Sequence, residues 1–189
     1  NSTQSDLERD IKAADLALAR SIAQETDFSM RNALWAIEKL GSFDAVLETD
    51  IAGMTELFSN FMSARPEVNL VYRLNPLGFM VFHYPIGPTS TVGSDFSFRD
   101  YFQRAKLGTN SLISKGRISP TTTQPVATAV MPLWGRDGEF LGIVATNIQL
   151  EALSQTLVKI SREYGPEEGF EVFIIDSSSQ IIAHANPDL

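Results

Sequence analysis

The sequence contains no cysteine and only two histidines among its 189 residues. Without cysteine, the chain has no disulfide, no thiolate nucleophile and no thiolate metal ligand. The histidines, His83 and His184, lie far apart and fall in different parts of the predicted fold. A Gly-x-Ser-x-Gly elbow and a Gly-rich phosphate loop are missing, and no pair of carboxylates stands out. We therefore expect no catalytic site, no metal site and no cofactor, and we expect that the chain is not an enzyme.

Positive charge is scarce as well. Lysine and arginine total 15 against 23 aspartates and glutamates, which gives a net charge of −8. This balance disfavours nucleic acid as a partner, and it disfavours attraction to anionic membrane surfaces, because both need a basic face. No apolar run approaches the ~20 residues that cross a bilayer, and the polar opening NSTQSDLERD is unlike a signal peptide. We interpret the chain as a piece of a longer protein whose membrane segments lie elsewhere.

Apolar residues are plentiful enough for a core, and in the first third of the chain they recur with the period of an α-helix. One narrow stripe comprises Leu7, Ile11, Ala14, Leu18 and Ile22, and a second comprises Leu47, Ile51, Met54, Phe58 and Phe61. Gly41 and Pro66 mark the expected ends of these helices. A long helix with a narrow apolar stripe often pairs with another helix, so we predict a homodimer through the N-terminal helix.

From residue 68 the pattern changes to that of β-strands. Residues 68–74 and 79–84 flank the turn NPLG, residues 126–134 and 139–150 flank the turn GRDG, and residues 111–119 form another apolar run. Strands joined by tight turns pair antiparallel. The prediction is an α+β fold with one five-stranded antiparallel sheet, on one side of which the helices of residues 6–64 pack.

Two more helices are predicted, over residues 97–107 and 150–164, and a last hairpin follows residue 169. Because this hairpin comes after a helix, we place it outside the main sheet. We divide the chain into an N-terminal stalk helix, residues 1–43, a central domain, residues 44–150, and a connecting helix with the first hairpin of a second lobe, residues 151–189.

Three stretches resemble motifs of the Cache domains, the PAS-like extracytoplasmic sensor domains of bacterial and archaeal histidine kinases, chemoreceptors and diguanylate cyclases. The stretch DFSFRDYFQRA, residues 95–105, is similar to the family's Asp-x-Ser-x-Arg-x-Tyr-Phe helix. Residues 124–153 resemble its last strand pair. Residues 170–188, FEVFIIDSSSQIIAHANPD, resemble the first hairpin of the membrane-proximal lobe of a double Cache.

The resemblance implies a function. The chain would be the periplasmic or extracellular sensor part of a cell-membrane receptor, and it would bind a small solute and signal through its helices to a cytoplasmic output domain. The alternative is a ligand-free dimerisation or protein-interaction module with the same fold. A site filled by Phe82, Phe98 and Phe102 would favour that alternative, and a polar pocket at Arg99 would favour the sensor.

The resemblance also implies site residues. In the family a small ligand lies between the sheet and the loop and helix above it, and an arginine of that helix grips a carboxylate. Arg99 matches this anchor, with Tyr101 beside it. The acidic residue that holds the ammonium in amino-acid-binding members corresponds here to Asn147, and Arg117 and Ser119 stand near the family's Tyr-x-Asp. This pattern favours a small carboxylate or a small neutral solute over an α-amino acid.

The residues themselves leave alternatives open at Arg99 and Tyr101. A guanidinium binds a carboxylate through two parallel hydrogen bonds, which makes Arg99 a good anchor for a small acid. Arg99 would instead be structural if it paired with Asp95 or Asp100. Tyr101 is either a wall of the site or part of the core.

Alternation along the predicted strands links four more candidates. Lys115 and Arg117 share one face of a strand, which is either the site or solvent, and we favour solvent for one of the two. His83 and Tyr84 point to opposite faces, so only one of them lines the site.

Overall fold

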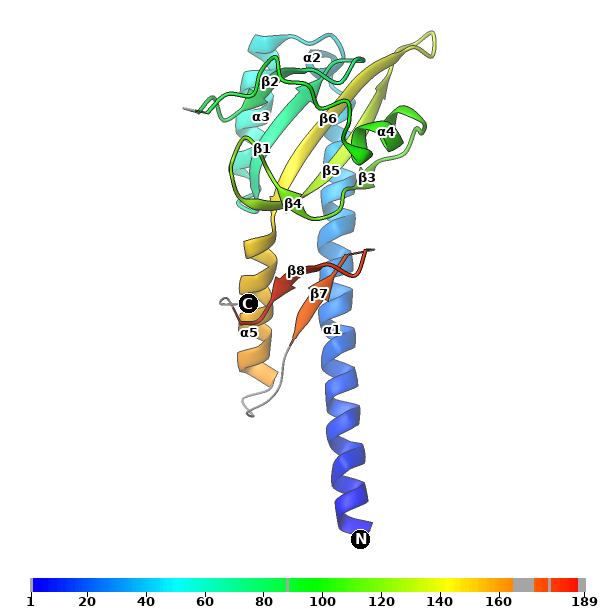
Figure 1. The fold of residues 1–189 in the computed structure, drawn as a ribbon, viewed down its shortest axis with the longest axis vertical. Coiled ribbons are helices and arrows are strands. Elements are labelled where there is room, and N and C mark those ends of the chain that lie inside the picture. The colour runs from blue at the N-terminus through cyan, green and yellow to red at the C-terminus, as the bar shows by residue number, and fades with distance from the viewer. Residues whose placement is uncertain (1, 88, 165–171, 177, 187–189) are drawn as a thin grey trace.

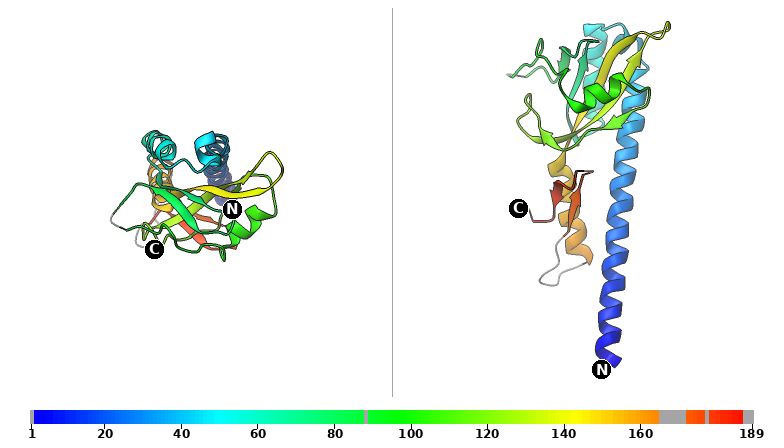
Figure 2. Two further views of the ribbon diagram at one scale, coloured as in Figure 1. Left: turned by 90° about the horizontal axis from the view of Figure 1, so that it is seen from above. Right: turned by 45° about the vertical axis from the view of Figure 1, so that its right-hand side comes forward.

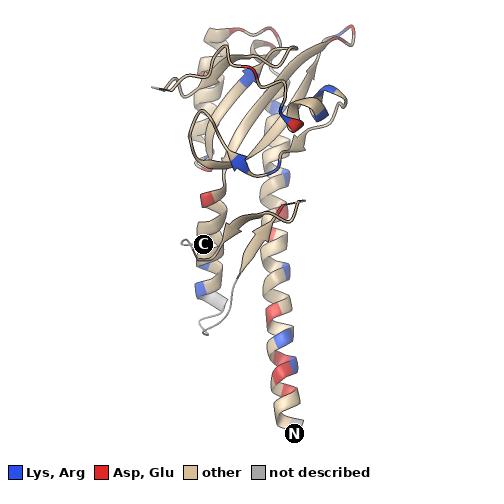
Figure 3. Ribbon diagram, viewed as in Figure 1, with Lys and Arg blue, Asp and Glu red and all other residues tan. Residues whose placement is uncertain are grey.

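The structure is a computed structural model that describes residues 2–87, 89–164, 172–176 and 178–186. Its longest element is α1 (Ser2–Gly41), which reaches the sheet with its C-terminal part (Figure 1). The N-terminal part of α1 projects beyond every other element, as the right-hand view of Figure 2 shows. Charged residues of both signs occur along this projecting part, whereas the strands contain few (Figure 3).

The main sheet has the strand order β2–β1–β6–β5–β3, with β4 also paired to β5. Its strands are β1 (Val68–Leu74), β2 (Met80–Tyr84), β3 (Leu112–Ile113), β4 (Arg117–Ile118), β5 (Pro125–Trp134) and β6 (Phe140–Gln149). Every pairing is antiparallel. The predicted α+β class and the single antiparallel sheet are confirmed.

The predicted strand over residues 111–119 is interrupted, and its two pieces, β3 and β4, both pair with β5. Ser114 causes the interruption. Its backbone N–H donates to the Thr128 carbonyl at 2.8 Å, but the Thr128 N–H donates to the Ser114 hydroxyl at 2.9 Å and not to a backbone carbonyl. A side chain therefore takes the place of one bond of the ladder, and the strand resumes only at Arg117.

Three helices cover one face of the sheet. α2 (Asp44–Leu47) and α3 (Ile51–Ser63) pack there with the C-terminal part of α1. Asp50 caps α3, because its carboxylate accepts the backbone N–H of Ala52 at 3.1 Å. The core of this face includes Ile37, Leu40, Met54, Phe58, Val71 and Val144. The predicted position of the helices on one side of the sheet is confirmed for those parts that reach it.

The loop after β2 and α4 (Asp100–Lys106) cover the opposite face (Figure 1). α4 begins later than predicted, because Arg99 has an extended backbone and stands at the N-cap. Tyr101, Phe102 and Ala105 of α4 pack with Tyr72 of β1 and with other apolar side chains of the sheet. The sheet is thus buried on both faces, and α4 forms the roof over the second one.

Below the sheet, α5 (Leu150–Tyr164) continues directly from β6 and packs beside α1. β7 (Phe173–Ile175) and β8 (Ile181–His184) pair as a separate two-stranded sheet, as predicted, although residues 169–171 and 177 of the predicted hairpin lie outside the described residues. Leu18 and Ile22 of α1 are buried against Leu157 and Ile160 of α5. Two of the five residues in the stripe that we assigned to a dimer contact are therefore used within the chain.

The three-part division of the chain stays a prediction; α5 extends below the central sheet, next to α1 (Figure 1). Among the described residues, no helix combines the length and the apolar character that a membrane span needs.

Position 142 on β6 requires a glycine, both because of its backbone conformation and because of the atoms that lie close to it. Its φ of +102° is unfavourable for other residues, and a Cβ at this position would collide with the Leu74 carbonyl oxygen. We expect Gly142→Ala to lower the free energy of unfolding by ~2 kcal/mol or more, measured by urea denaturation.

The matched control is Gly138→Ala in the β5–β6 turn. Gly138 also has a positive φ, of +79°, but nothing lies within 4 Å of the point that a Cβ would occupy there, so this change adds backbone strain without a collision. Equal losses in the two variants would show that the collision at Gly142 does not occur.

Candidate functional site

Polar side chains gather on the face of the sheet that α4 covers. They come from β1, α4, β4, the turn after β4, β5 and β6, and we call them the polar cluster: Tyr72, Tyr101, Arg117, Ser119, Thr128 and Asn147. Antiparallel register brings them together, since Thr128 stands opposite Asn147 on neighbouring strands. Four of these side chains are at most 1% exposed: Tyr101, Ser119, Thr128 and Asn147.

Asn147 is the centre of the cluster. Its Oδ1 accepts the Thr128 hydroxyl at 2.9 Å and Nη2 of Arg117 at 3.3 Å. Its Nδ2 donates to the Ser119 hydroxyl at 3.1 Å. A buried amide needs such partners, and here it finds them in side chains of three other segments. Asn147 therefore fixes the relative positions of β4, β5 and β6 at this point.

Arg117 is half-buried and uses only part of its guanidinium. Nη2 donates to Thr128 Oγ1 at 2.8 Å and to the Tyr72 hydroxyl at 3.5 Å, and Cζ lies 5.2 Å from the centre of the Tyr101 ring. Nε and Nη1 are buried and have no hydrogen-bond partner among the described residues. No described carboxylate forms an ion pair with Arg117. The cluster thus contains a buried positive charge with two unused donors.

Two tyrosines complete the cluster. The Tyr72 hydroxyl donates to the Tyr101 hydroxyl at 3.2 Å. Burial, and next the neighbouring Tyr101, raise the pKa of Tyr72 well above its ordinary value. The Tyr72 hydroxyl is therefore neutral over the physiological pH range, and it acts as a hydrogen-bond donor beside Arg117.

Arg99 stands at the N-cap of α4 and is half-buried. Its guanidinium lies over the Phe98 ring, with Cζ 4.8 Å from the ring centre, and its buried Nε has no partner among the described residues. The salt bridge to Asp95 or Asp100 that would make Arg99 structural does not form within the described chain. Asp95 instead accepts the backbone N–H of Ser97 at 2.7 Å, and a hydrogen bond from the Ser97 side chain, followed by this backbone bond, lowers the pKa of Asp95. The role of Arg99 in ligand binding stays a prediction.

The structure places the other four predicted site residues in different environments. Lys115 is exposed, whereas Arg117, two residues later, turns into the cluster. His83 is buried and stands opposite Tyr72 in the register of β1 and β2, on the cluster's face. Tyr84 packs with the helices on the opposite face. Ser119 belongs to the cluster through Asn147.

The three phenylalanines that would fill the site in the ligand-free alternative do not gather there. Phe82 packs with Phe58 in the core on the helix side, at 5.7 Å between ring centres. Phe98 is 65% exposed, and Phe102 packs with Phe140 at 5.9 Å. Polar groups, and not these rings, occupy the centre of the face under α4.

His83 holds the loop after β2 in place. Its Nε2 accepts the backbone N–H of Thr91 at 3.4 Å, and its Nδ1 lies 3.0 Å from the Pro85 carbonyl. The Thr91 hydroxyl in turn lies 2.7 Å from the Thr121 hydroxyl. This chain of bonds joins the loop to the turn that follows Ser119.

We expect His83→Leu to loosen this loop without unfolding the domain, because leucine fills the space but accepts no hydrogen bond. Each lost bond contributes ~1 kcal/mol, so the Thr91 amide should exchange ~5-fold or more faster with deuterium. His184→Leu, in the separate β7–β8 sheet, is the control. Unchanged exchange at Thr91 in His83→Leu would contradict the role given to His83.

Two members of the cluster, Tyr72 and Thr128, were missed in the sequence. Thr128 is the one polar residue in the run VATAV, residues 126–130, and that isolation was a usable signal. Tyr72 shares its side of β1 with Leu70 and Leu74, so the sequence indicates only a core residue.

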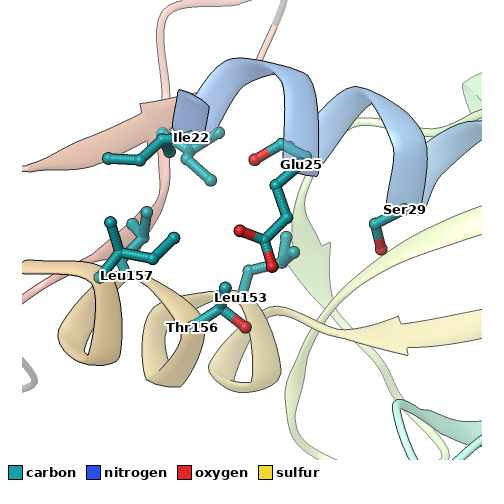
Figure 4. Close-up of a pocket in the computed structure, with 9 residues that line it drawn as sticks. Ile22, Glu25, Ser29, Leu153, Thr156 and Leu157 are labelled. Atoms are coloured by element: carbon teal, nitrogen blue, oxygen red, sulfur yellow. The ribbon is translucent and has the colours of Figure 1, made fainter. Parts of the chain in front are cut away.

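Two hollows lie below the sheet, and no residue of the polar cluster lines either. A cavity of about 80 Å³ separates α1 from α5, and Glu25 points from α1 toward α5 within it (Figure 4). A larger groove, of about 640 Å³, runs between α1 and β7 and has mainly apolar walls, including Leu18, Ile22 and Val172.

The fold and the cluster define an α+β domain in which a long helix accompanies an antiparallel sheet, with helices on one face and a closed polar site on the other. The chain matches the Cache domain family over residues 1–189. It therefore belongs to the Cache domain family, and the resemblance seen in the three sequence stretches is confirmed. A search of curated proteins found no match to the chain.

Ligand-binding domains of bacterial chemoreceptors share the fold. That of Pseudomonas fluorescens CtaA, in complex with L-isoleucine, has a TM-score of 0.73 at 18% identity and covers 100% of this chain and 75% of that one. That of Campylobacter jejuni Tlp3, in complex with 4-methylisoleucine, has a TM-score of 0.68 at 17% identity, covering 93% and 71%. That of the Pseudomonas aeruginosa amino-acid chemoreceptor PctC, in complex with GABA, has a TM-score of 0.64 at 17% identity, covering 97% and 77%.

Proposed function

We propose that this Cache domain is an extracytoplasmic sensor that binds a small carboxylate at the polar cluster. The observation that carries the proposal is the pair of buried Arg117 nitrogens, Nε and Nη1, without partners among the described residues. An unpaired buried guanidinium is costly, and a carboxylate is the small-molecule group that satisfies it best. Membership of a sensor-domain family and the small ligands in the related structures support a binding function over a catalytic one.

Arg99 would complete the site from the α4 side. Its Nε is also buried and unpartnered among the described residues, and it stands two residues before Tyr101, whose ring lies against Arg117. We therefore keep Arg99 as a second contact to the ligand, with Arg117 as the main anchor.

A ligand reaches the unpaired nitrogens of Arg117 only if the side chains or segments that cover them move, because these nitrogens are closed off from solvent. Movement is also the means of signalling in this proposal. Asn147 lies close to the end of β6, and α5 begins at Leu150. A shift at Asn147 is thus carried into α5, and from α5 into α1 through the contacts of Leu157 and Ile160 with Leu18 and Ile22.

In this proposal the chain is the periplasmic or extracellular part of a membrane receptor, and a histidine kinase or diguanylate cyclase is the expected class of output. A thermal-shift screen of small acids, amides and amines tests the binding function. A ligand at 100 times its Kd stabilises the folded state by about 2.7 kcal/mol, which raises the Tm by ~5–10 °C in a domain of this size. Stabilisation by amides or amines, but by no carboxylate, would contradict the proposal.

Dimerisation through α1 is a separate part of the proposal. With Leu18 and Ile22 used inside the chain, it rests on Leu7 and Ile11, which are 61% and 47% exposed. We expect a weak dimer in sedimentation at high protein concentration, and we expect the double change Leu7→Glu with Ile11→Glu to abolish it. Leu77→Glu, in an equally exposed turn, is the control. A dimer that survives the double change would exclude this surface.

A further inference from the structure

The amide oxygen of Asn147 and the hydroxyl of Ser119 already accept two hydrogen bonds each. Asn147 Oδ1 accepts from Thr128 and Arg117, and two bonds are all that a carbonyl oxygen ordinarily takes. The Ser119 hydroxyl accepts from Asn147 Nδ2 at 3.1 Å and from the backbone N–H of Thr122 at 3.3 Å. No carboxylate of the described residues touches the cluster. A bound ammonium group would bring three hydrogens, and the Asn147 and Ser119 oxygens could take none of them; only the hydroxyls of Tyr72, Tyr101 and Thr128, each already in a hydrogen bond, would remain.

The donor atoms, in contrast, are in surplus. Nε and Nη1 of Arg117 are buried and unpartnered among the described residues, and so is Nε of Arg99. The Tyr101 hydroxyl accepts from Tyr72, so its own hydrogen is available to a ligand. A group that is rich in acceptors and carries negative charge complements this set, and the two oxygens of a carboxylate provide it.

The positive charge of Arg117 also disfavours a ligand with an ammonium group. The Arg117 guanidinium lies against Asn147 Oδ1 and over the Tyr101 ring, which are the groups that would otherwise attract a cation. The protein's own positive charge thus takes the place that a ligand ammonium would need. A second cation beside it would be repelled and left without a partner in a buried site.

We propose that the ligand is a carboxylate without an ammonium group, and that the site rejects the α-amino acid of the same skeleton. This inference rests on the proposed function, since it names the chemical class that the carboxylate site accepts. It also sets the chain apart from the related domains whose structures contain L-isoleucine and 4-methylisoleucine.

Matched pairs of acids test the inference directly, because each pair differs only by a hydroxyl in place of the ammonium. Isothermal titration calorimetry on the unaltered chain would use L-lactate with L-alanine, 2-hydroxyisovalerate with L-valine, and L-malate with L-aspartate. For any pair that binds, the Kd of the hydroxy acid should be at least ~10-fold lower than that of the amino acid. A buried donor without an acceptor costs enough free energy to weaken binding by about this factor.

A variant that adds a hydrogen-bond acceptor to the polar cluster provides a second test of the inference. Asn147→Asp places a carboxylate where an ammonium could pair with it, so we expect the preference for the hydroxy acid to fall to within ~3-fold or to reverse. Asn75→Asp adds the same charge in the β1–β2 turn, where Asn75 Oδ1 accepts the N–H groups of Leu77 and Phe79 and an aspartate can do the same. This control should retain the preference of the unaltered chain.

The outcomes separate the two proposals. If the amino acid of a pair binds the unaltered chain as tightly as the hydroxy acid, the inference is overturned and the carboxylate sensor stands. If no acid of either kind binds, the proposed function fails and the inference fails with it. The titrations of the unaltered chain decide both questions, even if Asn147→Asp does not fold.

Discussion

Arg117→Met is expected to abolish carboxylate binding and to leave the domain folded. Methionine fills much of the same volume and removes the donors. Two charge-assisted hydrogen bonds to the ligand are then lost, each of ~1.5–3 kcal/mol, so the Kd should rise ~100-fold or more. The fold should survive, because Asn147 keeps its bonds to Thr128 and Ser119.

Three further variants test whether the guanidinium of Arg117 is the main anchor of the ligand. Arg117→Lys should also lose most affinity, because an ammonium is a single point of charge and cannot place donors where Nε and Nη1 lie. Arg99→Ala should weaken binding by ~10-fold or more, as expected for one charge-assisted bond. Arg136→Met, in the exposed β5–β6 turn, is the control and should bind as the unaltered chain does.

Titration calorimetry with a carboxylate from the thermal-shift screen measures these effects, and circular dichroism confirms that each variant is folded. If Arg117→Met retains the affinity of the unaltered chain and Arg99→Ala loses it, then Arg99 is the anchor and Arg117 is structural. If both variants bind normally, the ligand does not bind at the polar cluster.

Arg73→Ala is expected to cause the largest loss of stability. Arg73 is 2% exposed and donates to backbone carbonyls of three segments: Nε to Val46 at 3.0 Å, Nη2 to Leu141 at 2.7 Å, and Nη1 to Leu74. Burial lowers its pKa to about 10, so it is still charged at neutral pH. It therefore joins α2 to the C-terminal end of β1 and the N-terminal end of β6 through a buried charge.

Its removal leaves these carbonyls buried without partners and opens a cavity. We expect the free energy of unfolding to fall by ~3–5 kcal/mol, which corresponds to a Tm lower by ~6–20 °C. Chemical denaturation of Arg73→Ala against Arg136→Ala measures the difference. A loss under ~1 kcal/mol would show that Arg73 contributes no more than a surface charge.

Periodicity sufficed to predict the helices and the antiparallel sheet, because both depend on local apolar spacing and on turns such as NPLG and GRDG. It failed where a single side chain replaces a backbone bond, as the Ser114 hydroxyl does between β3 and β4. It also could not show that Leu18 and Ile22 face α5, since a stripe that packs within the chain looks the same as one that packs on a second copy.

The site was predictable only in part for a similar reason. Tyr101 and Asn147 of the polar cluster were identified through a family resemblance, whereas Thr128 joins Asn147 through strand register, which the sequence does not specify. Arg117 and Lys115 share a strand face in the sequence, but the interruption after Ser114 frees Lys115 to turn to solvent. Long-range pairing and local breaks in strands thus determine which polar residues meet.

The most direct test of a carboxylate at Arg117 is an NMR titration that observes the arginine Nε–H signals of the ¹⁵N-labelled domain. With a carboxylate from the screen, the Arg117 Nε–H signal should shift and its exchange with water should slow, because Nε gains an acceptor, while the Arg136 signal stays unchanged. If the domain is saturated with the carboxylate and the Arg117 signal does not move, the ligand binds elsewhere and the account is wrong.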